Sequence, residues 1–142
     1  MVGGFAGVLH GASLVTQDLD LCLLLTPENV AKLRSILKDL HPKHRMTPKK
    51  FSFLDVPDDI SQLNNLYLET DLGTVDLISS VTGVGDFERV SRKAETAEVF
   101  GYSCKVISIE DLIRAKEAMG REKDVAMVKQ LKVILEKLRV KP

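Results

Sequence analysis

The stretch Thr16-Gln17-Asp18-Leu19-Asp20-Leu21-Cys22-Leu23-Leu24-Leu25 decides the fold. From Asp18 to Leu25 every residue except the two acids is apolar, a pattern typical of a short strand buried on both faces. Thr26-Pro27 follows directly and begins a helix, because threonine is a good N-cap and proline fits the first helical position. The stretch therefore predicts a buried strand that passes straight into a helix.

Further elements are expected on both sides of this strand. The pattern predicts helices over residues 5–10, 27–40, 108–120 and 122–138, a hairpin of strands over 66–70 and 74–79, and a strand over 98–107 broken by Gly101. Residues 43–61 are expected to be loop with one short element at most. Hairpins mixed with strand–helix units favour a single α+β domain over residues 1–142, with a mixed β-sheet flanked by helices and a C-terminal helical pair.

Two of these helices carry strong boundary or face signals. Ser108 and Asp111 resemble a capping box at the start of the third helix, and Gly120 ends it. In the last helix one face is expected to be apolar and buried; it holds Val125, Val128, Leu131, Leu135 and Leu138.

Composition and charge exclude several classes of protein. The 142 residues are 44% hydrophobic and 28% charged, as in an ordinary globular domain. The longest apolar run, Leu21–Leu25, is too short to cross a bilayer, and no leader-like segment precedes it, so neither membrane insertion nor secretion is expected. Cys22 and Cys104 lack zinc-site spacing and are expected to be buried thiols in a reducing, cytoplasmic compartment.

Basic residues are concentrated rather than absent. Twenty basic residues balance twenty acidic ones, which excludes a protein that grips nucleic acid by bulk charge. Residues 41–50 and 114–141 are nevertheless net basic, and acids concentrate over residues 55–86. Such segments either bind a phosphate-rich ligand or form a solvated helix face, and the sequence leaves both open.

The acids inside the predicted strands carry the chemistry. Asp18 and Asp20 are two residues apart, so on a strand they project to the same side, roughly 6–7 Å apart. Asp76 lies in the second hairpin strand between Val75 and Leu77. Acids in apolar strands are costly unless paired or metal-bound, and carboxylates are ligands that magnesium prefers. Three carboxylates in one small sheet are the donor set of a one- or two-cation phosphoryl-transfer site.

Other interpretations of single residues are open. Asp18 can lie at the solvent end of its strand, and Asp76 can pair with a lysine. Lys116 either extends to solvent or points into a cleft. His10 is expected to bond to backbone rather than act as a catalyst. Gly3-Gly4 before a short helix would let a triphosphate approach backbone N–H groups.

Three blocks of the sequence together resemble a known family. They are Gly3–Gly11 (GGFAGVLHG) with Thr16–Asp20 (TQDLD), then Thr70–Leu77 (TDLGTVDL), then Ile109–Lys116 (IEDLIRAK) with Gly120–Asp124 (GREKD). In this order they resemble the DNA polymerase β-like nucleotidyltransferases, and more narrowly the minimal nucleotidyltransferases related to abortive-infection toxins of type IV toxin–antitoxin systems. The resemblance covers nearly the whole chain.

The resemblance implies both a fold and a reaction. The fold is nucleotidyltransferase-like, and the reaction moves a nucleoside monophosphate from an NTP to a hydroxyl of RNA (tRNA included) or protein. It implies that Asp18, Asp20 and Asp76 are catalytic and bind Mg²⁺ or Mn²⁺, with Asp76 orienting or deprotonating the attacking hydroxyl. It implies an antitoxin partner, and nucleotide binding by Gly3, Gly4, Thr16, Lys116, Arg121 and Asp124.

Three departures from the family pattern keep a second hypothesis open. Leu14 stands where the family often has an arginine, and Met127 stands where a further acid is common. The chain begins at Met1-Val2, so the family's N-terminal helix and most of its first strand are expected to be missing. The alternative is therefore a degenerate member of the fold that binds nucleotide or a partner protein without turnover.

Overall fold

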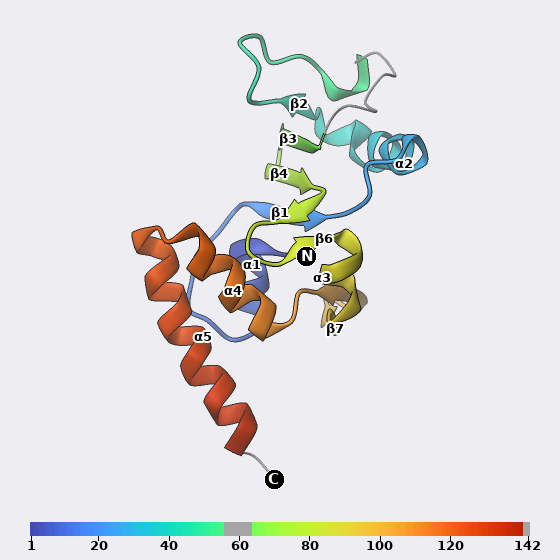
Figure 1. Ribbon diagram of the computed structural model, residues 1–142. Coiled ribbons are helices and arrows are strands. Elements are labelled where there is room, and N and C mark those ends of the chain that lie inside the picture. Colours follow the sequence, from blue (N-terminus) through green and yellow to red (C-terminus); the bar gives the residue numbers. More distant parts are fainter. Residues whose placement is uncertain (56–63, 141–142) are drawn as a thin grey trace.

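The computed structural model describes residues 1–55 and 64–140, which form an α+β domain built on a mixed sheet (Figure 1). The sheet has the order β1-β4-β3-β2, with β1 at Leu19–Cys22, β4 at Gly73–Ile78, β3 at Asn65–Thr70 and β2 at Lys43–His44. β1 pairs with β4 in parallel, and the other pairs are antiparallel. The predicted fold class is confirmed.

Residues Met1 and Val2 join this sheet to a second hairpin. Val2 forms an antiparallel bridge with Asp20, and its N–H donates to the Asp20 carbonyl at 2.9 Å. Met1 donates to the Lys105 carbonyl at 2.8 Å and accepts from the Ile107 N–H at 3.0 Å. The N-terminal dipeptide thus lies between β1 and β8 (Tyr102–Val106), whose hairpin partner is β7 (Glu95–Val99).

The two faces of the sheet carry separate cores. Strand residues alternate faces. Leu66, Leu68 and Leu77 pack on one face with Phe53 and Val30 of α2 (Pro27–Leu37).

The other face carries the remaining helices, which include α1 (Gly3–Leu9) and the adjacent pair α4 (Ile109–Met119) and α5 (Glu122–Val140) (Figure 1). The short elements are η1 (Lys38–Leu40), η2 (Phe53–Asp55), β5 (Ser80–Val81), β6 (Gly85–Asp86) and α3 (Phe87–Arg92).

Hydrogen bonds confirm the predicted starts of α2 and α4. The Thr26 hydroxyl accepts from the Asn29 N–H at 3.2 Å at the start of α2. The Ser108 hydroxyl accepts from the Asp111 N–H at 3.1 Å at the start of α4, and Gly120 ends that helix with φ of +66°. His10 contacts backbone as expected, because its Nε2 lies 2.7 Å from the Ile107 carbonyl oxygen.

Three predicted elements differ from the structure. The strand expected over residues 18–25 is shorter, Leu19–Cys22, and its residues are half-buried rather than buried. Residues 98–107 contain a reversal rather than one broken strand, because Phe100 and Gly101 both have positive φ (51° and 82°), as in a type I′ hairpin turn. In α5, Val125 and Leu138 are exposed, and the buried face runs through Asp124, Met127, Val128 and Leu131. The helix is rotated so that an acid faces the interior.

Three further expectations bear on the rest of the chain. Residues 43–61 hold β2 and η2 within the described part, and residues 56–63 lie outside it. Cys22 and Cys104 are free thiols, but both are half-buried rather than buried. None of the described helices has the length and apolarity required to cross a membrane.

Candidate active site

The sheet register places the predicted carboxylates together. Asp20 on β1 and Asp76 on β4 are direct partners in the parallel ladder, so their side chains leave the same face of the sheet. Asp18 lies immediately before β1 and reaches the same place. All three line a cavity of about 520 Å³. The structure therefore brings together the three residues that the sequence singled out.

Asp18 is held by two threonines rather than by the strand. Its N–H donates to the Thr16 hydroxyl at 3.2 Å, a local turn that orients the residue. Its Oδ1 accepts a hydrogen bond of 2.6 Å from the Thr74 hydroxyl on β4. Thr16 also lines the cavity. Thr74 was not predicted as a site residue, although its position two residues before Asp76 puts it on the same face of β4.

The glycine pair differs in what each position requires. Gly3 has φ of +70°, and a Cβ there would lie 2.1 Å from Asp20 Oδ2. Only glycine lets the backbone approach the Asp20 carboxylate this closely. A Cβ on Gly4 would meet the movable end of the Leu14 side chain at 2.9 Å. The two glycines lie inside the first turn of α1 rather than before it.

A group of basic side chains faces the carboxylates from the helical side. Lys116 on α4 lines the cavity together with Arg121, and their charges converge on Asp124. Asp124 is 1% exposed, and its oxygens lie 3.3 Å from Lys116 Nζ and 2.6 Å from Arg121 Nε. Lys116 therefore points into the cleft, and its ion pair with Asp124, like that of Arg121, fixes the position of the side chain.

Arg45 approaches the site from the opposite side. It follows β2, lies over the Tyr67 ring at 5.3 Å, and donates from Nη2 to Asp76 Oδ2 at 2.6 Å. Tyr67 is the cross-strand partner of Asp76. Asp76 is thus paired with a cation, although with an arginine and not with a lysine. Residues 41–50 were predicted only as a basic segment, so this individual role of Arg45 was missed.

Burial and mutual repulsion set the protonation of the carboxylates. Burial, with the nearby Asp76 and Asp18, raises the pKa of Asp20, and Lys116 and Arg45 only partly offset the rise. Burial also raises the pKa of Asp76 despite Arg45. Burial opposes ionisation of Asp124, but hydrogen bonds from Arg121 and Lys116 outweigh it and lower the pKa of Asp124. A bound cation would stabilise the ionised forms of Asp20 and Asp76, whereas Asp124 is already stabilised by Lys116 and Arg121.

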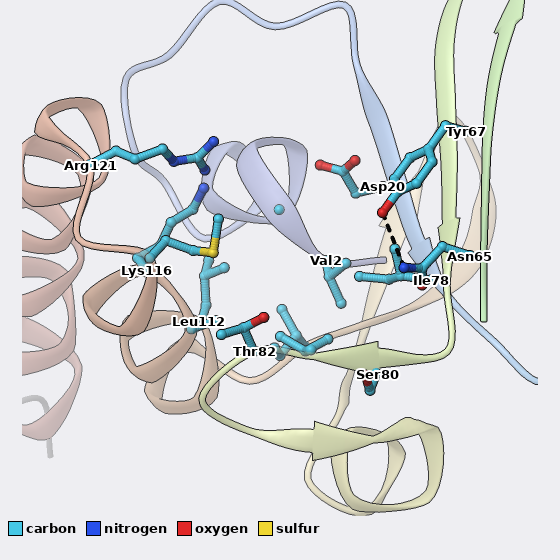
Figure 2. A pocket seen from close by; sticks show the side chains of 15 residues that line it. Val2, Asp20, Asn65, Tyr67, Ile78, Ser80, Thr82, Leu112, Lys116 and Arg121 are labelled. Carbon is cyan, nitrogen blue, oxygen red and sulfur yellow. Dashed lines mark hydrogen bonds between the residues drawn. The ribbon is translucent and has the colours of Figure 1, made fainter. Parts of the chain in front are cut away.

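A second hollow adjoins the first at Asp20. Its volume is about 330 Å³, and Asp20, Lys116 and Arg121 line both hollows. Figure 2 shows Lys116 and Arg121 on one side of this hollow and Tyr67 and Asn65 on the other. The Asn65 amide donates to the Tyr67 hydroxyl oxygen at 3.1 Å. The hollow thus combines polar groups with an apolar wall that includes Leu112 and Ile78.

The donor set fits a hard divalent cation. Carboxylate oxygens are the ligands that Mg²⁺ and Mn²⁺ prefer. Asp76 Oδ1 is buried with no hydrogen-bond partner, so an acceptor atom is available beside Asp20. Across residues 1–55 and 64–140, no three His, Cys, Asp or Glu side chains form a ready-made coordination cluster. Arg45 engages the other oxygen of Asp76, and any cation bound by all three aspartates would have to compete with it.

Comparison with known proteins adds no identification. No protein-family model matches the chain, and no curated protein matches its sequence.

Proposed function

We propose that this protein is a metal-dependent nucleotidyltransferase that moves a nucleoside monophosphate from an NTP to an acceptor hydroxyl. The single observation that carries the proposal is the parallel register that pairs Asp20 with Asp76 beside Asp18, facing Lys116 and Arg121 across one cavity. Carboxylates on one wall and cations on the other match a triphosphate with its divalent cation. Such catalysis depends mainly on positioning and charge neutralisation.

Each group then has a chemical role. Asp18, Asp20 and Asp76 would hold Mg²⁺ or Mn²⁺, which when bound neutralises charge on the phosphate oxygens. Asp76 accepts the proton of the attacking hydroxyl, a role that its raised pKa suits. The hydroxyl oxygen bonds to the α-phosphorus as the bond to the bridging oxygen breaks, and pyrophosphate leaves. Lys116 and Arg121 stabilise its negative charge.

The other residues that the sequence predicted to bind nucleotide act through the backbone or by positioning another side chain. Gly3 admits the Asp20 carboxylate next to the start of α1, and Thr16 orients Asp18. Gly4 lines the cavity beside them. Asp124 is a positioning residue, since it touches Lys116 and Arg121 rather than an exposed surface.

The proposal extends to acceptor and setting in coarser terms. The acceptor is an RNA hydroxyl, with tRNA included, or a protein hydroxyl. Arg45 of the net basic segment over residues 43–50 contacts Asp76. A cytoplasmic toxin with an antitoxin partner is the setting that the family resemblance suggests.

Pyrophosphate release tests the reaction. The protein is incubated with each NTP, Mg²⁺ or Mn²⁺, and total RNA or protein extract. We expect acceptor-dependent pyrophosphate that disappears in Asp76→Asn and persists in Asp86→Asn, since Asp86 caps α3 outside the cavity. Equal release by both variants would contradict the proposal.

The Arg45–Asp76 ion pair favours a second candidate function, a degenerate module that binds nucleotide or a partner protein without turnover. The two are separated by Mn²⁺ binding to the free protein. An enzyme binds the ion and loses it in Asp18→Asn, whereas a pure interaction module binds no ion in either form.

A further inference from the structure

Arg45 is fixed in place by its backbone and ring contacts, but only one of its two terminal nitrogens forms a hydrogen bond with Asp76. Its N–H donates to the Tyr67 carbonyl at 3.0 Å, and its guanidinium lies over the Tyr67 ring. The guanidinium reaches Asp76 through Nη2 alone. Arg45 Nη1 and Asp76 Oδ1 are both buried and have no hydrogen-bond partner.

An arginine–carboxylate pair outside this cavity looks different. Arg89 grips Asp111 with two bonds, Nη1 to Oδ2 at 3.0 Å and Nη2 to Oδ1 at 3.2 Å. Two-bonded geometry is the stable form of an arginine–carboxylate pair, and a buried polar atom without a partner is costly. The one-bonded Arg45–Asp76 pair therefore leaves one donor and one acceptor for other partners.

The two unused atoms need partners of opposite charge. Asp76 Oδ1 suits a cation, and Arg45 Nη1 suits an anion. Both side chains line the cavity that Asp18 and Asp20 share, so an oxyanion and a divalent cation bound in this cavity would lie beside them. Lys116 comes from α4 and Arg121 directly precedes α5, so among the described residues that line this cavity Arg45 is the arginine on the β2–β3 side.

We propose that Arg45 is an exchange residue: it neutralises Asp76 in the free protein and passes to a substrate phosphate when a divalent cation takes its place on Asp76. The exchange rests on the proposed function and gives Arg45 a role in the same site. The ligand chemistry is a phosphate oxyanion. Its source is either the triphosphate of the NTP or a phosphodiester of the acceptor strand, and the test separates them.

The proposal predicts opposite shifts in two affinities of one variant. In Arg45→Gln, Mn²⁺ alone binds at least roughly threefold more tightly, because a competitor leaves Asp76. With Mn²⁺ bound, the same variant binds phosphate roughly tenfold more weakly, since one charge-assisted hydrogen bond is lost. Calorimetry or electron paramagnetic resonance measures Mn²⁺, and the phosphate probes are inorganic tripolyphosphate and a short single-stranded oligoribonucleotide. Weakening with tripolyphosphate assigns Arg45 to the NTP, and weakening with the oligonucleotide alone assigns it to the acceptor.

Matched variants exclude a merely structural explanation. Arg92→Gln makes the same charge change on α3, outside the cavity, and is expected to shift neither affinity. Arg45→Lys keeps the charge and is expected to lie between wild type and Arg45→Gln, which keeps the test valid if the glutamine variant melts early. Asp76→Asn frees Arg45, so tripolyphosphate binds more tightly, and less so when Arg45→Gln is also present.

Some results would overturn the proposal. These are Mn²⁺ affinity that is unchanged or weaker in Arg45→Gln, or both phosphate probes binding as in wild type. Neither measurement needs turnover. If the protein has no transferase activity but shows the opposite shifts, the proposed function is wrong and the exchange by Arg45 stands. If the protein is active but shows no shifts, the proposed function stands and the exchange is wrong.

Discussion

Replacing Gly3 by alanine tests how the backbone makes room for Asp20. Gly3 has φ of +70°, a conformation that costs an alanine about 1–2 kcal/mol. A Cβ would also lie 2.1 Å from Asp20 Oδ2, and such overpacking typically adds about 1–3 kcal/mol. The sum is roughly 2–5 kcal/mol, which corresponds to a fall in Tm of roughly 6–15 °C for a domain of this size.

The same substitution should displace the Asp20 carboxylate as well as lower the stability. A carboxylate displaced by about 1 Å is expected to cost roughly a hundredfold in turnover. Thermal melting by circular dichroism and pyrophosphate release measure the two effects. Gly4→Ala is the matched control: it meets only the flexible Leu14 side chain and gains helix propensity, so its stability should stay within about 1 kcal/mol of wild type. Gly3→Ala that melts and works like Gly4→Ala would refute the reasoning.

Three further substitutions probe the surrounding groups. Asp124→Asn leaves Lys116 and Arg121 without their shared anion and is expected to lower the free energy of unfolding by roughly 2–4 kcal/mol, measured with urea. Asp20→Asn should raise stability at neutral pH, because the raised pKa means that ionised Asp20 costs stability above its folded-state pKa. That gain should vanish as the pH falls toward the unfolded value of 3.8, which urea midpoints across pH would show. Thr74→Val frees Asp18 Oδ1 and should weaken Mn²⁺ binding roughly tenfold, measured by calorimetry.

Much of the fold could be predicted because local signals agree with it. The Thr26 and Ser108 caps mark helix starts that the structure confirms. The β7–β8 reversal was missed because Phe100 at positive φ is unusual for a bulky residue, and only the following glycine signals a turn. The burial of α5 was partly misassigned, because sequence periodicity counts Asp124 as surface, whereas Lys116 and Arg121 allow it to be buried.

The sequence predicts the acids of the candidate site but not the side chains that hydrogen-bond to them. Asp18, Asp20 and Asp76 stand out as acids in apolar strands. Thr74 and Arg45 do not stand out, since a threonine in a strand and an arginine in a loop are ordinary, and only the register shows what they touch. Polar–apolar alternation along residues 65–69 could have placed Tyr67 on the site face.

Transfer of label from NTP to an acceptor tests the central claim most directly. Each α-labelled NTP is incubated with Mg²⁺ or Mn²⁺, total bacterial RNA and protein extract, and either the wild-type protein or the Asp18→Asn/Asp20→Asn double variant. The account predicts label on RNA or protein with the wild type and none with the double variant. No transfer by well-folded wild-type protein with any NTP, or equal transfer by the double variant, would contradict it.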